Sequence, residues 1–273
     1  MVSVGAIILM IVDFIIAFLI PIIPAIIVKR KYKTSMKVFF IGWAVWFVFA
    51  MILEQIMHML VLKSPAGDII RNNMWLYGLY GGLAAGIFEE TGRFLAMKTL
   101  FRKNYDNPYN SIMYGVGHGG FEAMYLLGIG MINNLIYAIM INAGQTSVLL
   151  DSVPETQQAT VQQVFDSLIE TPTYMYLMGP LERVSAVILH IALSVIVWIG
   201  VVKNKKALYP LAIALHALVD AAMVIINSFG IPVLLLELIV LVMALCVALV
   251  AGLLWKSNGM TQSRNDIDKS FEE

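Results

Sequence analysis

The chain has 273 residues, of which 60% are hydrophobic and only 13% are charged, and its mean hydropathy is +0.82. A soluble domain of this length has no core large enough to bury so much apolar surface, so the composition predicts a protein whose solvent is lipid. The formal net charge of +0 argues against nucleic acid as a partner, and the single cysteine, Cys246, excludes an intrachain disulfide.

Seven apolar segments are long enough to cross a bilayer, since about 20 helical residues span ~30 Å of hydrocarbon. In chain order they are 3–28, 38–62, 74–101, 111–142, 173–202, 208–228 and 231–254. The fourth segment is over-long, and we expect it to be tilted, kinked or broken near Gly128 and Gly130. The predicted fold is therefore an all-α polytopic transmembrane bundle over residues 1–255, followed by a polar, disordered cytoplasmic tail, 256–273.

The basic residues predict the orientation of this bundle. With seven spans, only Lys63 and Arg71 lie in loops on one side, whereas 13 of the 18 Lys and Arg residues lie on the other. The basic side comprises the loops 29–37, 102–109 and 203–207 and the tail. Because basic loops stay in the cytoplasm, we predict an external N-terminus, a cytoplasmic C-terminus and a location in the plasma membrane. The longest loop, 143–172, is then external, and its stretch 156–169 predicts an amphipathic helix on the membrane surface.

Four of the predicted spans carry ionisable side chains at one common depth. Each such side chain costs ~2.5–3.5 kcal/mol inside a span, so its presence needs a reason. The residues are Glu89, Glu90 and Arg93 in the third span, His118 and Glu122 in the fourth, His190 in the fifth, and His216 and Asp220 in the sixth. At ~1.5 Å per residue, all eight lie about 12–18 Å from the predicted cytoplasmic face. Randomly scattered residues would seldom share one depth, so we predict a single buried site.

The spacing of these residues orients them within their helices. Three pairs are each four residues apart, which places the two members on one helix face. The pairs are Glu89 with Arg93, His118 with Glu122, and His216 with Asp220. Four glycines surround His118, at positions 115, 117, 119 and 120, and they allow another helix or a substrate backbone to approach closely.

Two interpretations of this layer compete. In the structural one, the charged residues are ion pairs that tie the helices together. The three histidines favour a functional site instead, because imidazoles contribute little to holding helices together but are good proton carriers, oxyanion donors or metal ligands. The adjacent carboxylates of Glu89 and Glu90 resist simultaneous ionisation, and a carboxylate that can take up a proton beside imidazoles suits water activation. We interpret four further intramembrane polar residues, Asp13, Glu54, His58 and Glu237, as packing or hydration features, although Glu54 could line an outer vestibule.

Four motifs in successive spans carry a resemblance to a known family. They are EETGR at 89–93, GHGGFEA at 117–123, ILHIALS around His190, and HALVD at 216–220. In this order they resemble the YhfC family of intramembrane peptidases, which is similar to the group that contains CAAX-processing proteases, PrsW-type proteases and the APH-1 scaffold subunit. The first motif is one residue shorter than the EExxxR element of that group. The second combines the positions of two of the group's elements, FxxxH and FxxxE.

The resemblance implies hydrolysis of a peptide bond in the cytoplasmic half of the bilayer. It implies that Glu89 or Glu90 activates water and that Arg93 holds the charge and orientation of this pair. His216, set by Asp220, and His190 would stabilise the oxyanion or bind a metal. His118 and Glu122 would complete the pocket.

The resemblance leaves two mechanisms and three functions open. A metalloprotease, for example one with zinc, needs three protein ligands and a water, which His118, His190 and His216 could supply; a glutamic protease needs no metal. Besides the lipid bilayer, the expected partner is a membrane protein or peptide substrate. The alternatives to a protease are a non-catalytic scaffold similar to APH-1 and a proton-coupled transporter, which also places carboxylates and histidines at mid-membrane.

Overall fold

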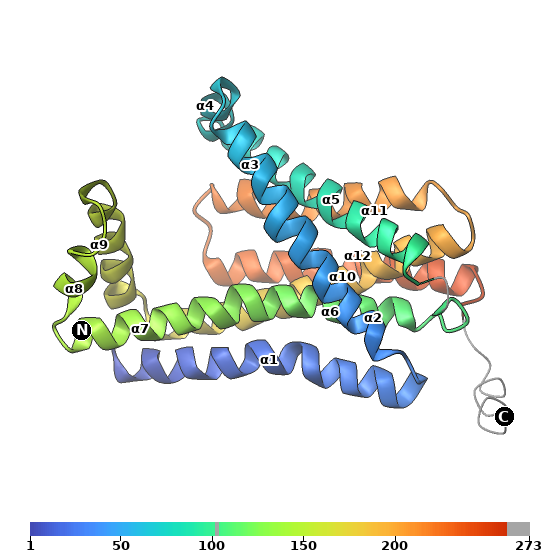
Figure 1. Cartoon of the computed structure of the whole chain (residues 1–273), viewed down its shortest axis with the longest axis horizontal. Coiled ribbons are helices and arrows are strands. Elements are labelled where there is room, and N and C mark those ends of the chain that lie inside the picture. The colour runs from blue at the N-terminus through green and yellow to red at the C-terminus, as the bar shows by residue number, and fades with distance from the viewer. Residues whose placement is uncertain (102–103, 261–273) are drawn as a thin grey trace. The chain divides into compact units, whose positions relative to one another are not determined.

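The computed structural model describes residues 1–101 and 104–260, and these residues form helices and no strands (Figure 1). The disorder predicted for the tail concerns residues that lie almost entirely outside this part of the chain. The helices along the first half are α1 (Val4–Tyr32), α2 (Met36–Trp46), η1 (Phe47–Glu54), α3 (Gln55–Leu62), α4 (Pro65–Arg71), α5 (Met74–Thr99) and α6 (Asn110–Ala123). Those along the second half are η3 (Met124–Ile129), α7 (Gly130–Asn142), α8 (Thr146–Leu150), α9 (Glu155–Glu170), η4 (Thr173–Leu177), α10 (Met178–Val202), α11 (Leu208–Asn227) and α12 (Val233–Ser257).

Among the residues that the structure describes, six helical stretches are long and apolar enough to cross a membrane, and each lies close to a predicted span. They are Val4–Tyr32, Met36–Leu62, Asn110–Asn142, Thr173–Val202, Leu208–Asn227 and Val233–Ser257. The predicted all-α membrane-spanning fold is thus confirmed. The remaining predicted span corresponds to α5, whose 26 residues include Glu89, Glu90 and Arg93. The count of seven spans and the orientation stay predictions.

Two π-helical segments interrupt the spans. The first, η1, lies in the middle of the second span and ends at the buried Glu54, and no feature of the sequence indicated it. The second, η3, falls where the fourth span was expected to be broken, and α7 resumes at Gly130. A π-turn widens the helix by one residue and often lies at a functional site.

The chain divides into two compact units, of which the first comprises Met1–Ile20 and Ala123–Val184. Its small apolar core includes Met10 and Ala138, both fully buried. The Asn142 side chain joins the N-terminus to α7, because its Oδ1 accepts from the Val2 backbone N–H at 2.8 Å and its Nδ2 donates to the Val2 carbonyl at 3.0 Å. The predicted amphipathic helix is α9, whose buried face carries Phe165 and Leu168.

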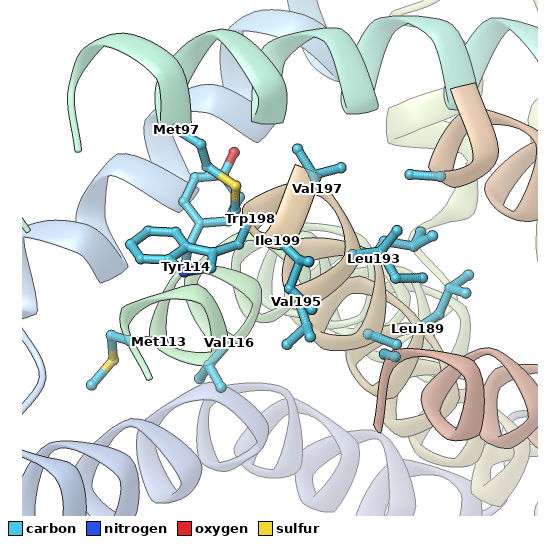
Figure 2. Packing of buried hydrophobic residues seen from close by; sticks show 14 of the residues in the cluster. Met97, Met113, Tyr114, Val116, Leu189, Leu193, Val195, Val197, Trp198 and Ile199 are labelled. Atoms are coloured by element: carbon cyan, nitrogen blue, oxygen red, sulfur yellow. The ribbon is translucent and has the colours of Figure 1, made fainter. Parts of the chain in front are cut away.

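The second unit comprises Pro21–Glu122 and Ser185–Glu273 and contains the larger core. Figure 2 shows part of this core, where Met97 of α5, Tyr114 of α6 and Trp198 of α10 lie close together, all fully buried. The Phe101 ring packs edge-on against Tyr114 at a centroid distance of 5.5 Å. This apolar core holds α5, α6 and α10 together.

Within the second unit, α5 runs antiparallel to α11 (Figure 1), and a row of glycines allows the two backbones to touch. Gly78, Gly82 and Gly86 recur every four residues and share one face of α5. A Cβ at Gly82 would lie 2.4 Å from the Ala217 carbonyl oxygen, and one at Gly86 would lie 2.8 Å from that of Ile213. These contacts set the spacing between the helices that carry Glu90 and His216.

We expect Gly82→Ala to destabilise the folded protein by about 1–3 kcal/mol, because the new methyl group must push two helix backbones apart. The matched control is Gly81→Ala on the neighbouring position, where a Cβ meets no atom within 4 Å. This control should be neutral or stabilising by up to about 1 kcal/mol, since alanine is the better helix former. Equilibrium unfolding in mixed micelles titrated with dodecyl sulfate measures both, and equal stabilities for the two variants would contradict the packing argument.

Candidate active site

The second unit brings the eight predicted site residues onto four helices that surround one polar interior. Glu89, Glu90 and Arg93 come from α5, His118 and Glu122 from α6, His190 from α10, and His216 and Asp220 from α11. Six of them are buried, while the side chain of Glu122 is 13% exposed and that of Asp220 is 36% exposed. The contacts within this group link all four helices.

The Glu90 carboxylate contacts a guanidinium, that of Arg93, and an imidazole, that of His216. Arg93 Nη1 donates to both carboxylate oxygens of Glu90, at 2.7 and 2.9 Å, and His216 Nδ1 lies 2.8 Å from Glu90 Oε1. The i,i+4 spacing placed Arg93 with Glu89, but in the structure Arg93 binds Glu90, three residues before it. The Arg93–Glu90 pair is fully buried, so its charges are screened by one another and by His216 rather than by water.

His190 lies at the centre of the site and has one defined tautomer. Arg93 Nη2 donates to His190 Nδ1 at 3.0 Å, and since a guanidinium has no acceptor, Nδ1 carries the lone pair. The proton therefore lies on Nε2, which is 2.6 Å from Glu122 Oε2. The predicted His118–Glu122 pair is thus replaced by a contact of Glu122 with His190.

Glu89 pairs with His118 across two helices. His118 Nε2 lies 2.8 Å from Glu89 Oε2, and the Tyr114 hydroxyl lies 3.5 Å from the other ring nitrogen of His118. Tyr114 was not among the predicted site residues, although its position four residues before His118 matches the aromatic of the FxxxH element. It contributes the second polar contact that orients the His118 ring.

Glycines on α6 allow this close approach of the His118 and His190 rings, whose centroids are 4.8 Å apart. A Cβ at Gly119 would lie 2.9 Å from the His190 ring, and one at Gly115 would lie 2.5 Å from the Ile191 Cα. The glycine-rich stretch therefore lets another helix, α10, approach His118. Of the two possibilities expected from the sequence, a helix or a substrate backbone, the structure shows the helix.

Glu89, His118 and His190 form a group of potential metal ligands. Each offers one donor atom, and the three atoms lie within 4.8 Å of one another in a buried position. Tetrahedral zinc with bonds of about 2.0–2.1 Å places its ligand atoms about 3.3 Å apart. The distances from Glu89 Oε2, 2.8 Å to His118 Nε2 and 3.8 Å to His190 Nδ1, bracket that value. Two imidazoles and one carboxylate are a ligand set of catalytic zinc, which keeps its fourth position for water or substrate.

The surrounding contacts also fit this group. A ligating imidazole usually donates its other N–H to a carboxylate or another acceptor. Glu122 occupies that position for His190, and the Tyr114 oxygen occupies it for His118. Arg93 Nη2 and a metal would compete for the same lone pair on His190 Nδ1, so metal binding requires Arg93 to keep only its bonds to Glu90.

His216, a predicted candidate ligand, is engaged elsewhere in this structure. Besides the contact of Nδ1 with Glu90, its Nε2 lies 3.4 Å from Asp220 Oδ2. The predicted His216–Asp220 pair is therefore present, and Glu89 takes the place of His216 among the clustered donors. The assignment of roles to these residues stays a prediction.

A second polar cluster, made of Glu54, His58 and Tyr80, lies in the same unit. His58 Nε2 is 3.1 Å from Glu54 Oε1, and His58 Nδ1 is 2.8 Å from the Tyr80 hydroxyl. The sequence indicated the Glu54–His58 pair by its i,i+4 spacing but gave no signal for Tyr80. The three groups satisfy one another, but Glu54 also interacts electrostatically with His216 and Asp220, so this carboxyl adjoins the site rather than serving packing alone.

The fold and the clustered Glu and His side chains define a polytopic membrane protein with a buried polar site. A family profile described as "YhfC intramembrane metalloprotease" matches residues 16–249. The chain belongs to this family and is an integral membrane protein.

Similarity to a curated protein agrees with this assignment. The chain is 40% identical over 228 residues to a protein of Bacillus subtilis (strain 168) described as "Uncharacterized membrane protein YhfC", and the match covers 82% of this chain and 86% of that protein. No solved structure matches the chain. Of the two mechanisms left open by the sequence, the family description supports the metalloprotease and gives no support to the glutamic protease.

Proposed function

We propose that this protein is an intramembrane metalloprotease that hydrolyses a peptide bond of a membrane protein or peptide at the site formed by α5, α6, α10 and α11. The observation that carries the proposal is the buried group of Glu89, His118 and His190, whose donor atoms lie within 4.8 Å of one another. Three protein ligands fit a catalytic metal, which keeps one position for water, better than a structural metal, to which the protein supplies all four.

In this proposal Glu89, His118 and His190 hold the metal, which when bound supplies a Lewis acid and lowers the pKa of water. Glu122 takes the proton of the attacking water and returns it to the leaving amine. Its Oε2 is buried beside His190 Nε2, while the side chain as a whole is 13% exposed, so this role falls to the other oxygen, Oε1.

Glu90, Arg93 and His216 form a fixed polar support beside this group. Both oxygens of Glu90 accept from Arg93, and one also faces His216, so Glu90 is a poor base and serves as a buried anion. Asp220, the most exposed of these carboxylates, orients His216 from the other side. Both ring nitrogens of His216 are thus engaged by carboxylates, so His216 could donate to the oxyanion only through Nε2, after releasing Asp220.

Removal of the metal tests the proposal. We expect protein purified in detergent to cleave a panel of transmembrane peptides, and a chelator to lower the rate at least about 100-fold, because a catalytic metal contributes several kcal/mol to transition-state stabilisation. Adding zinc back after the chelator has been removed should restore cleavage. Cleavage that persists at full rate in metal-free protein would contradict the metalloprotease, and pH-gradient-driven flux by a protein that cleaves nothing would favour the transporter.

A further inference from the structure

A cavity of about 350 Å³ lies in the second unit between the ends of α5, α10 and α11, away from the Glu and His side chains of the proposed site. Its lining combines two kinds of residue. Phe94, Val201 and Tyr209 form an apolar floor, and Lys98, Lys205 and Lys206 contribute ammonium groups. Among the described residues that line this cavity there is no Asp or Glu.

A tight turn after α10 places two of the lysines. Asn204 has a φ of 53°, in the left-handed region that asparagine tolerates. The Asn204 N–H donates to the Val201 carbonyl at 3.4 Å, and the Lys205 N–H donates to the Gly200 carbonyl at 2.8 Å. This is the Schellman pattern of a helix C-terminus, and it folds Lys205 and Lys206 back toward the cavity.

The apolar floor is built by stacked rings next to a cation. The rings of Phe94 and Tyr209 are stacked at a centroid distance of 4.7 Å, and Lys98 Nζ lies 5.4 Å from the Phe94 ring centroid. Tyr209 is also fixed by its hydroxyl, which lies 2.7 Å from Thr91 Oγ1. It belongs to the first turn of the 20-residue helix α11, where the helix dipole favours a negative charge.

We propose that this cavity binds the headgroup of an anionic phospholipid, with the phosphate at Lys98, Lys205 and Lys206 and the glycerol and upper acyl chain on Phe94, Val201 and Tyr209. Basic cavities between transmembrane helices recognise anionic lipids in this way. The apolar floor favours a lipid over free phosphate, which would gain nothing from stacked rings. This binding site is independent of the proposed hydrolysis.

The test is native mass spectrometry of the full chain in detergent, with phosphatidylglycerol or phosphatidylcholine of the same acyl chains as probe. We expect the protein to retain one phosphatidylglycerol and to prefer it over phosphatidylcholine. Lys98→Gln/Lys205→Gln/Lys206→Gln should weaken phosphatidylglycerol binding about 100-fold, at about fivefold per lysine. Val201→Trp should weaken it at least tenfold with every charge intact, because the indole fills the floor of the cavity.

The matched control is Lys29→Gln/Arg30→Gln/Lys37→Gln, which removes three charges from exposed positions outside the cavity and should leave the affinity within about twofold. Equal loss in this control and in the cavity variant would overturn the site in favour of general surface attraction. Unchanged binding in both cavity variants would overturn it as well. If inorganic phosphate at equal concentration competes as well as phosphatidylglycerol does, the site is one for free phosphate, and the proposal of a lipid fails.

Discussion

Glu89→Gln is expected to abolish both metal binding and peptide hydrolysis. The amide keeps the size of the side chain but removes the anionic oxygen that lies 2.8 Å from His118 Nε2 and 3.8 Å from His190 Nδ1. Two neutral imidazoles alone hold a catalytic metal poorly, because the third ligand both completes the geometry and offsets the charge. We expect the metal content to fall from about one per chain to near zero, and the rate of cleavage to fall at least about 1,000-fold.

A second substitution separates metal binding from proton transfer. Glu122→Gln preserves an oxygen acceptor for His190 Nε2–H but removes the proposed base. We therefore expect it to keep the metal while slowing cleavage by about 100- to 10,000-fold, the usual range for loss of a general acid–base group. Metal content is measured by elemental mass spectrometry on the purified protein, and cleavage with the same panel of transmembrane peptides.

The control for both substitutions is Glu237→Gln on α12, which changes a buried intramembrane carboxyl outside the proposed site. It should alter neither metal content nor cleavage by more than about twofold. Full metal content in Glu89→Gln would contradict the assignment of this carboxylate as a ligand. Loss of metal in Glu122→Gln would instead make Glu122 a ligand and leave the base unassigned.

The helical fold could be predicted from the sequence because lipid leaves few alternatives. A backbone in hydrocarbon must satisfy its own hydrogen bonds, so apolar segments of sufficient length become helices. The last predicted span, 231–254, is observed as Val233–Ser257. The π-helical segment η1 could not be predicted, because it depends on tertiary packing: Phe49 packs so closely against α5 that a Cβ at Gly92 would lie 2.6 Å from its ring.

The clustering of these polar residues could be predicted, but their pairings could not. Depth counting selected residues on four helices, and the structure brings all of them together in one unit. Helix periodicity restricts which residues share a face, yet it does not choose between Glu89 and Glu90 as the partner of Arg93, since spacings of three and four residues both suit a contact. The choice depends on His118 and His216, which reach the two carboxylates from other helices at 2.8 Å each.

The second large effect is expected for stability, from Arg93→Met. Arg93 is fully buried and donates to Glu90 and to His190, so its removal leaves a buried carboxylate without its counter-ion. Breaking a buried ion pair on one side costs about 3–5 kcal/mol, most of it from the uncompensated charge. We expect the free energy of unfolding, measured by dodecyl sulfate titration in mixed micelles, to fall by that amount. Arg71→Met, which breaks an exposed pair with Asp68, should cost less than about 1 kcal/mol.

A double-mutant cycle shows whether the loss of stability in Arg93→Met arises from the uncompensated charge of the Glu90 carboxylate. Glu90→Gln removes the charge but keeps an oxygen that can accept from His216 Nδ1. If the uncompensated Glu90 carboxylate causes the loss, the double variant Arg93→Met/Glu90→Gln will lose about 1–3 kcal/mol less unfolding free energy than the sum of the two single losses. Strict additivity would mean that Arg93 stabilises the fold through His190 and its own packing instead. The same cycle with Glu89→Gln in place of Glu90→Gln should be close to additive, because Arg93 makes its carboxylate contacts with Glu90. The two cycles together therefore distinguish the polar support, made of Glu90, Arg93 and His216, from the group of potential metal ligands.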